Sequence, residues 1–328
     1  MPTVLITTSM LRPGEAGGVG LLEKAGMDLR FVPQLSYGPA ALIEQASGCV
    51  ATICGDEVYN EEIFAGAPSL RHVARHGIGY NSVDVEAATK HGVIVTITPG
   101  ANTEPVADHT FSLMLSLAHR VLLDDRAIRG GEWPGLIRAD VFHKTLGLVG
   151  LGAIGRAVVR RAKGFDMRIL AFEPAPDLQF VAAYGVELVA LDEVFRESDF
   201  VSLHAPLVPE TKGIVDARRL GLMKPTAYFI NTARGGLVDE AALYAALTGA
   251  QIAGAGLDVR AVEPSTGGRF SALDNVVLTP HSAGRTETMW LVGGTMAAQA
   301  VLAALHGERP NGLVNPVAWK QRVETASV

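Results

Sequence analysis

The feature that most constrains the fold of this chain is a regular alternation of short β-branched runs with longer stretches of helical spacing. Such an alternation is typical of parallel sheets whose strands are joined by crossover helices. It occurs in two series. The first series has expected strands at residues 4–7, 49–54, 70–74 and 93–97, with expected helices at 18–25 and 83–91, and it ends at Pro99-Gly100.

The second series has six expected strands that are apolar on both faces, as in a sheet covered by helices on both sides. They lie at residues 145–149, 168–172, 200–203, 227–230, 252–257 and 276–279. The sequence therefore predicts an α/β fold with two Rossmann-like, doubly wound parallel-sheet domains and a cleft between them.

A long apolar segment at residues 105–129 separates the two series. It has Pro in its first turn, as helix starts favour, and is apolar nearly all round, which predicts a helix buried between domains or subunits. A last helix at residues 286–306 follows the second series, and residues 311–316 look extended. We expect this end to return to the first domain. That domain then comprises residues 1–100 and 287–328, around a second domain at residues 101–286.

Composition excludes several classes of protein. The 328 residues carry 28 Lys and Arg against 34 Asp and Glu, a formal net charge of −6, so no overall positive field is available to bind nucleic acid or an anionic membrane. No apolar run reaches the ~18 residues of a membrane helix, and the first residues do not resemble a signal peptide. Cys49 and Cys54 are too few for a disulfide framework and are expected to be small buried side chains. We therefore expect a cytoplasmic protein.

A glycine-rich turn joins the first strand of the second series to the next helix. The sequence GLGAIG places glycines at Gly150, Gly152 and Gly155, where side chains would block the tight turn and the approach of a pyrophosphate to the helix N-terminus. Glu173 lies at the end of the next strand, where an acid accepts hydrogen bonds from the adenosine ribose. A carboxylate there repels a 2′-phosphate and no Arg follows it, so the pattern predicts NAD rather than NADP.

Three polar residues stand at the ends of strands in the second domain, where open α/β sheets bind ligands. They are Arg234 in NTARGG, Glu263 before Pro264, and His281 after Pro280. An imidazole titrates near 6.5 when unperturbed, and an adjacent carboxylate favours imidazolium, so such a pair can donate a proton at neutral pH. A guanidinium is permanently charged and forked, which suits a substrate carboxylate.

These motifs, in this order, resemble the NAD-dependent D-isomer-specific 2-hydroxyacid dehydrogenases, the family of phosphoglycerate, glycerate and D-lactate dehydrogenases. The resemblance covers nearly the whole chain and is carried by residues 150–155, 204–207, 231–236, 257–263 and 280–281. It implies hydride transfer between NAD and a D-2-hydroxy acid/2-oxo acid pair of the phosphoglycerate, glycerate/hydroxypyruvate or glyoxylate type. In that family the residue matching His281 is the acid/base, that matching Glu263 is its partner, and that matching Arg234 binds the substrate carboxylate.

The resemblance also implies wider sets of binding residues, and Asp258 is expected to accept a hydrogen bond from the nicotinamide carboxamide. The implied cofactor residues are Gly150, Gly152, Ala153, Ile154, Gly155, Glu173, Ala205, Pro206, Thr211, Thr232, Ala233, Asp258, His281, Gly284 and Val106. The implied substrate residues are Arg75, His76, Gly77, Ile78, Gly79, Asn102 and Arg234. Backbone N–H groups of residues 75–79 are expected to bind the carboxylate, while Arg75 is either a ligand for a second anionic group or structural. No metal site is assigned.

Two other functions stay open at this point. The fold is shared by NAD-sensing proteins similar to the C-terminal-binding corepressors, although no partner motif or basic patch favours that function here. Phosphite dehydrogenases share the Arg, Glu and His set. Formate dehydrogenases pair their His with Gln, so Glu263 argues against that chemistry. The apolar helix at residues 105–129 suggests a homodimer.

Overall fold

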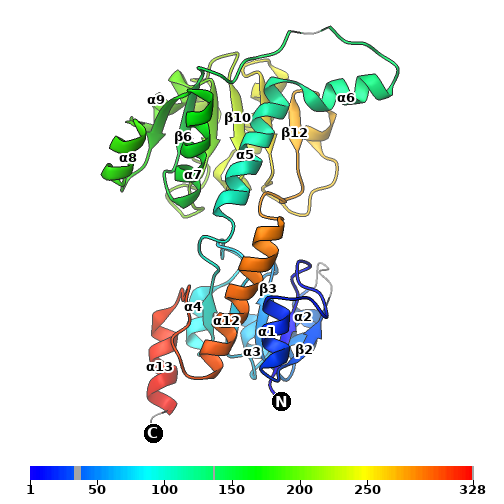
Figure 1. Cartoon of the computed structure of the whole chain (residues 1–328), viewed down its shortest axis with the longest axis vertical. Helices are drawn as coiled ribbons and strands as arrows, with labels where there is room; N and C mark the ends of the chain where they lie inside the picture. Colours follow the sequence, from blue (N-terminus) through cyan, green and yellow to red (C-terminus); the bar gives the residue numbers. More distant parts are fainter. Residues whose placement is uncertain (33–37, 136, 327–328) are drawn as a thin grey trace. The chain divides into compact units, whose positions relative to one another are not determined.

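The computed structural model describes residues 1–32, 38–135 and 137–326, and for residues 323–326 only the backbone. These residues form two compact units (Figure 1). Unit 1 comprises Met1–Asn102 and Gly284–Val328, and unit 2 comprises Thr103–Ala283.

Unit 1 contains a parallel sheet of five strands in the order β2-β1-β3-β4-β5. The strands are β1 (Thr3–Ile6), β2 (Asp28–Phe31), β3 (Cys49–Cys54), β4 (His72–Arg75) and β5 (Ile94–Thr96). The helices are α1 (Gly18–Lys24), α2 (Pro39–Ala46), α3 (Glu61–Gly66), α4 (Val85–Lys90), α12 (Gly294–Leu305) and α13 (Pro316–Ala326). The β-branched runs form the central strands because their side chains are buried on both faces of the sheet.

The C-terminal part of unit 1 packs on its N-terminal part. Helix α12 lies against α1, β3 and β4, and α13 lies against α4 and β5. Residues before α13 are extended: the N–H of Val314 donates to the carbonyl of Val95 at 2.8 Å. Cys49 and Cys54 are both buried and free, as the sequence predicted.

Unit 2 contains a parallel sheet of seven strands in the order β12-β11-β10-β9-β6-β7-β8. The strands are β6 (Thr145–Val149), β7 (Arg168–Phe172), β8 (Glu187–Leu188), β9 (Phe200–Leu203), β10 (Tyr228–Asn231), β11 (Gly254–Leu257) and β12 (Val276–Leu278). After β8 the chain crosses to the other half of the sheet, so the strand order reverses between the neighbouring strands β6 and β9. Such a reversal of strand order opens a ligand crevice at the carboxyl ends of the strands.

Both faces of the unit 2 sheet are covered by helices. The helices are α5 (Thr103–Ala118), α6 (Val121–Arg129), α7 (Ala153–Ala162), α8 (Leu178–Tyr184), α9 (Leu191–Glu197), α10 (Ala217–Leu220) and α11 (Glu240–Thr248). One apolar core includes α5 and α7, and a second includes α9, α10 and α11. The predicted α/β fold of two parallel-sheet units is confirmed.

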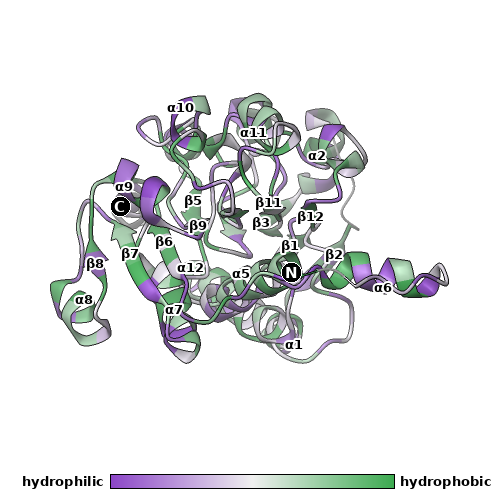
Figure 2. Cartoon of the chain, turned by 90° about the horizontal axis from the view of Figure 1, so that it is seen from above, coloured by the Kyte–Doolittle hydropathy of each residue, from purple (hydrophilic) through white to green (hydrophobic). Residues whose placement is uncertain are grey.

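The single helix expected at residues 105–129 is wrong. The segment forms α5 and α6, separated at Arg120, whose backbone adopts a left-handed conformation with φ of 53°. Helix α5 is buried inside unit 2, where it packs on α7, β10, β11 and β12. By contrast, no side chain of α6 is buried in the described chain, and Figure 2 shows hydrophobic and hydrophilic stretches alternating along it.

Other elements differ from the expectations in smaller ways. The edge strands β2 and β8 and the helix α13 were not expected. The helix expected at residues 286–306 has a π-helical turn at Met289–Gly293 before α12. None of the helices in the described ranges combines the length and apolarity required to span a bilayer.

Candidate active site

Six loops at the carboxyl ends of parallel strands in unit 2 carry most of the predicted site residues. Residues 150–155 follow β6, Glu173 follows β7, and residues 204–207 follow β9. On the other half of the sheet, residues 232–236 follow β10, residues 258–263 follow β11, and residues 279–283 follow β12. Parallel pairing brings all these loops to one edge of the sheet.

The glycine loop after β6 is built on close backbone contacts. Gly150 has φ of 101°, and a Cβ atom there would lie 2.6 Å from the carbonyl oxygen of His204. A Cβ on Gly155 would lie 2.4 Å from the carbonyl oxygen of Gly150. These two glycines therefore shape the turn of the protein itself, whether or not a nucleotide is bound.

Gly152 is different, because a Cβ atom there would meet nothing within 4 Å. It is the N-cap residue of α7 and has no side chain to cap the helix. In the part of the chain that the structure describes, the first-turn N–H groups of Ala153 and Ile154 donate to no protein group. A helix N-terminus of this kind attracts phosphate groups, and the open space suits a pyrophosphate.

Glu173 is fixed beside the glycine loop. Its Oε2 atom accepts a hydrogen bond from the N–H of Leu151 at 2.8 Å, and its Oε1 atom accepts one from Ala175 at 3.1 Å. The carboxylate is half-buried. The position fits a dinucleotide whose ribose follows the pyrophosphate along the carboxyl edge of the sheet.

His281 and Glu263 form a directly bonded pair. The distance between Nδ1 of His281 and Oε2 of Glu263 is 2.6 Å, and each side chain is 31% exposed. The other carboxylate oxygen of Glu263 accepts a hydrogen bond from the N–H of Arg260 at 2.7 Å. Glu263 is therefore held by its own loop. Because it bonds to Nδ1 of His281, Nε2 is the ring nitrogen on the side away from Glu263.

The loop that carries His281 is anchored by Asp258, whose side chain is 1% exposed. Its Oδ1 atom accepts hydrogen bonds from the hydroxyl of Thr279 (2.6 Å) and the N–H of Ser282 (2.8 Å), and its Oδ2 atom accepts one from the N–H of Ala283 (3.0 Å). The backbone carbonyl of Asp258 accepts the N–H of His281 at 2.8 Å. These bonds hold His281 in a left-handed conformation with φ of 50°, which only a few per cent of non-glycine residues adopt.

Sequence reasoning missed this anchoring role of Asp258, and it also missed Thr279 and His109. Nε2 of His109, on α5, lies 3.0 Å from Oγ1 of Thr279 and 3.6 Å from Oδ1 of Asp258. No motif spacing could have paired residues so far apart along the chain. The predicted contact of Asp258 with the nicotinamide carboxamide stays a prediction.

Arg234 is presented by a turn that Asn231 braces. The side chain of Asn231 donates to the carbonyl of Arg234 and accepts from the N–H of Ala233, both at 3.0 Å. The next residue, Gly235, packs so closely on the following loop that a Cβ atom would lie 1.9 Å from the carbonyl carbon of Arg260. This contact places the Arg234 turn beside the loop that bears Glu263.

The other predicted cofactor residues of unit 2 have structural partners. The hydroxyl of Thr211 donates to the carbonyl of Pro206 at 2.6 Å, which closes the loop that begins at Ala205. Thr232 bonds through its hydroxyl to Thr110 of α5 at 3.2 Å. Val106 is buried on α5.

Unit 1 carries the remaining predicted residues. In the loop after β4, several polar groups already bond to other groups of the protein. The Arg75 guanidinium is 8% exposed; it forms an ion pair with Asp56 and donates to the carbonyl of His76 at 2.6 Å. Nε2 of His76 lies 3.1 Å from the carbonyl oxygen of Met289, and burial lowers the pKa of His76 to about 4, so the ring is neutral.

Two backbone N–H groups of this loop also bond to carbonyl groups of the protein. The N–H groups of His76 and Gly77 donate to the carbonyls of Cys54 and Arg75, each at 2.9 Å. Among the described residues, the N–H groups of Ile78 and Gly79 have no hydrogen-bond partner. Asn102 and Gly284 lie together in unit 1: a Cβ atom on Gly284 would be 3.7 Å from Cβ of Asn102.

Comparison with known proteins identifies the family. A sequence profile described as "D-isomer specific 2-hydroxyacid dehydrogenase, NAD binding domain" matches residues 111–283. A glyoxylate reductase of Korarchaeum cryptofilum is 43% identical over 290 residues, which cover 86% of this chain and 87% of that protein. A D-3-phosphoglycerate dehydrogenase of Mycobacterium bovis is 40% identical over 77% of this chain but only 48% of that protein.

Two solved structures match nearly the whole length of the chain. The TT0316 protein of Thermus thermophilus superposes with a TM-score of 0.87 at 35% identity, covering 95% of this chain and 99% of that one. A glyoxylate reductase of Paecilomyes thermophila superposes with a TM-score of 0.84 at 26% identity, covering 96% and 98%. The chain belongs to the D-isomer specific 2-hydroxyacid dehydrogenase family, and its cofactor is NAD.

Proposed function

We propose that this chain reduces a small 2-oxo acid to the corresponding 2-hydroxy acid, of D configuration where the product is chiral, and catalyses the reverse reaction, with His281 as the acid/base. The observation that carries the proposal is the 2.6 Å contact between Nδ1 of His281 and Oε2 of Glu263 on a loop anchored by Asp258. A carboxylate on Nδ1 stabilises the imidazolium and leaves Nε2 as the nitrogen that exchanges a proton.

In the reduction, the Nε2–H of His281 donates its proton to the carbonyl oxygen of the oxo acid. Negative charge builds on that oxygen as the carbonyl carbon accepts hydride, and Arg234 stabilises it while binding the carboxylate. The cofactor, when bound, would supply the hydride as NADH in the reduction and accept it as NAD⁺ in the oxidation. In the oxidation, neutral His281 takes the hydroxyl proton, and Glu263 then stabilises the resulting imidazolium.

The proposed cofactor contacts follow from the glycine loop and the two strands beside it. The N–H groups of Ala153 and Ile154 bind the pyrophosphate at the N-terminus of α7, and Glu173 binds the adenosine ribose. The fit rests on the open space at Gly152 and the bonded position of Glu173. In unit 1, we propose that the N–H groups of Ile78 and Gly79 bind a substrate carboxylate oxygen.

Among possible substrates, we propose that glyoxylate and hydroxypyruvate are preferred to phosphorylated oxo acids. Arg75 is the one permanently charged side chain of residues 75–79, and its guanidinium is already paired with Asp56 and buried. The glyoxylate reductase of Korarchaeum cryptofilum also matches over most of its length, whereas the phosphoglycerate dehydrogenase matches over about half of its own. The corepressor and phosphite alternatives are not favoured by these relatives.

A substrate panel tests both proposals. Glyoxylate, hydroxypyruvate, pyruvate and 3-phosphohydroxypyruvate are each assayed with NADH and with NADPH, and phosphite is assayed with NAD. We expect kcat/KM to be highest for glyoxylate or hydroxypyruvate with NADH. Preferred turnover of 3-phosphohydroxypyruvate would contradict the structural role of Arg75, and the absence of turnover with every oxo acid would contradict the reaction itself.

Replacing Arg234 with alanine is expected to lower kcat/KM for the preferred oxo acid by about 10²-fold or more, because a charged, forked donor to the carboxylate and carbonyl oxygen is lost. Arg234→Lys keeps the charge but loses the fork, so its activity should be intermediate. The dissociation constant of NADH, measured by fluorescence titration, should change little in both variants. Arg218→Ala, at an exposed arginine of α10, is the matched control and should keep wild-type kinetics.

We also propose that the protein is a homodimer in which α6 contributes to the interface. Val121, Leu122 and Ile128 of α6 are about half-exposed, and beyond this helix Trp133 and Ile137 are 91% and 97% exposed. Apolar side chains gathered in this way on a soluble protein commonly mark an interface, and a second copy of the chain is the simplest partner.

Light scattering measures the assembly directly. The wild type is expected to show twice the 34.6 kDa mass of one chain. The double variant Val121→Asp, Leu122→Asp should shift the mass toward one chain, whereas Val58→Asp, at an exposed apolar residue of unit 1, should not. A wild-type monomer would exclude the homodimer.

The two buried, free cysteines are consistent with a reducing compartment, so a cytoplasmic location is proposed.

A further inference from the structure

Unit 1 contains a pocket at the edge of its sheet opposite to the loop of residues 75–79. The pocket has a volume of about 780 Å³, in the range of small-molecule sites. Arg71 and Val93, which line it, directly precede β4 and β5, so the pocket lies at the amino ends of these parallel strands. The proposed substrate loop of residues 75–79 lies at the opposite, carboxyl end of β4. The pocket therefore belongs to no site described above.

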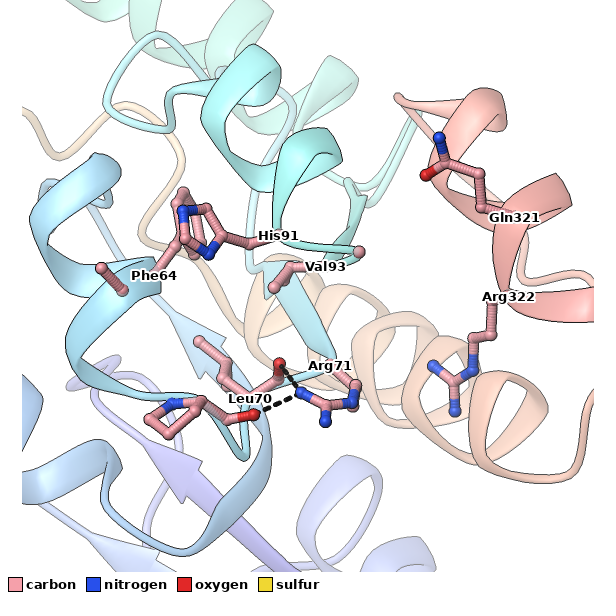
Figure 3. Close-up of a pocket in the computed structure, with 10 residues that line it drawn as sticks. Phe64, Leu70, Arg71, His91, Val93, Gln321 and Arg322 are labelled. Atoms are coloured by element: carbon pink, nitrogen blue, oxygen red, sulfur yellow. Dashed lines mark hydrogen bonds between the residues drawn. The ribbon is translucent and has the colours of Figure 1, made fainter. Parts of the chain in front are cut away.

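Two arginines form the cationic side of the pocket (Figure 3). Arg322 comes from α13, and its guanidinium is directed toward that of Arg71. Among the described residues, Arg71 is fixed through a single nitrogen: Nη1 donates to the carbonyls of Pro68 and Leu70, at 2.5 and 3.0 Å. Its Nε and Nη2 groups make no hydrogen bond in the part of the chain that the structure describes, so they can donate to a ligand.

The Arg322 guanidinium has a donor atom with no partner among the described residues. Its Nη1 atom is buried and makes no hydrogen bond to any described residue. Burial, and next the charge of Arg71, lower the pKa of Arg322 below its usual value. Buried guanidinium donors are usually hydrogen-bonded, and two like charges that face each other are unfavourable. An anion between them would satisfy both conditions at once.

Among the described lining residues, no side chain supplies a counter-charge to this pair. No Asp or Glu occurs among the described lining residues. Glu61, outside the lining, is already bonded to His91 at 2.9 Å and to Lys90 at 3.1 Å. His72, on β4, is buried. Burial, and next the charge of Arg322, lower the pKa of His72 to about 3, so its ring is neutral and adds no charge. The pocket thus carries a surplus of positive charge.

We propose that this pocket binds a small multivalent oxyanion, with phosphate or carboxylate groups, through Arg71 and Arg322. Guanidinium groups bind such oxygens in a bidentate manner, which suits two arginines on opposite sides of one anion. Phe64, Leu70 and Val93 form an apolar wall beside them, so an organic anion with a short apolar part also fits. Because α13 provides Arg322, the bound anion ties this helix to the sheet of unit 1.

Calorimetric titration of the full chain tests the proposal. Pyrophosphate and citrate are titrated separately at constant ionic strength, with the protein saturated with NADH so that the glycine loop is occupied. We expect saturable binding of at least one of the two anions, and their ranking distinguishes phosphate from carboxylate as the preferred group. Arg71→Gln and Arg322→Gln should each weaken binding about tenfold or more, since each removes a charged donor pair.

Two further variants separate this pocket from other anion sites. Lys320→Gln removes an exposed cation of α13 outside the lining and should leave the affinity unchanged. Arg234→Ala should also leave it unchanged, because the proposed substrate site takes no part. Thermal melting without anion should show Arg322→Gln to be no less stable than the wild type, since it relieves repulsion. The proposal is wrong if neither anion binds the wild type, or if binding is lost with Arg234→Ala but persists in both glutamine variants.

Discussion

The His281→Ala variant is expected to turn over the preferred 2-oxo acid about 10²- to 10⁴-fold more slowly than the wild type while it binds NADH with similar affinity. General acid catalysis by a positioned side chain contributes a factor of this size, and His281 is the imidazole that Glu263 holds. Steady-state kcat at saturating substrate measures the loss, and fluorescence titration measures the NADH dissociation constant. A kcat within threefold of the wild type would mean that His281 is not the acid.

The backbone at His281 makes a second variant necessary. Alanine disfavours the left-handed conformation found here, so His281→Ala could lower activity by shifting the loop rather than by removing the imidazole. Asparagine adopts this conformation more readily and cannot act as the acid. His281→Asn should therefore be as inactive as His281→Ala, with a melting temperature closer to the wild type. His119→Ala, at an exposed histidine, should behave as the wild type.

The parts of the fold that the sequence predicted are those governed by burial. The strands β3, β6, β7 and β9 were predicted with their observed bounds, because each is a mainly apolar run whose side chains are mostly buried. The edge strand β2 was missed because Asp28–Phe31 is not fully buried and carries two charged residues. The two-residue strand β8 is too short to give a periodic pattern.

The break between α5 and α6 could not be predicted from local sequence. Residues 118–121 contain neither Gly nor Pro, and Arg120 adopts a left-handed conformation that its residue type does not favour. The break depends on tertiary packing: α5 is buried against the sheet of unit 2, whereas α6 leaves the core and exposes its apolar side chains. Periodicity alone indicated one long apolar helix because it does not report which surface a side chain meets.

For the candidate site, residue types and chain order were sufficient to find the His281–Glu263 pair and the glycine loop. They were not sufficient to assign what each group contacts. Both carboxylate oxygens of Asp258 hold the His281 loop, and the Arg75 guanidinium is paired with Asp56. A motif position specifies a charge, but the partner of that charge lies on another loop and is visible only in three dimensions. Ligand contacts are therefore hardest to predict from sequence where another protein group already bonds to the side-chain atoms that the ligand would use.

Replacing Gly150 with alanine is expected to lower the free energy of unfolding of unit 2 by about 2–4 kcal/mol, the range of severe backbone and packing defects. The new Cβ atom would lie 2.6 Å from the carbonyl oxygen of His204, at a backbone with φ of 101° that alanine rarely adopts. Urea unfolding followed by circular dichroism measures the change. A loss below about 0.5 kcal/mol, the size of a neutral surface substitution, would contradict the close contact.

The neighbouring substitution Gly152→Ala separates the needs of the fold from those of the cofactor. Its Cβ atom would meet nothing within 4 Å and its backbone φ is −67°, so stability without cofactor should stay within about 0.5 kcal/mol of the wild type. A methyl group there would occupy the space proposed for the pyrophosphate, so NADH affinity should fall about tenfold or more, a loss of roughly 1.4 kcal/mol. Unchanged NADH affinity in a stable Gly152→Ala variant would place the pyrophosphate elsewhere and overturn the proposed cofactor site. A loss of both stability and affinity would instead show that Gly152, like Gly150, is required by the turn itself.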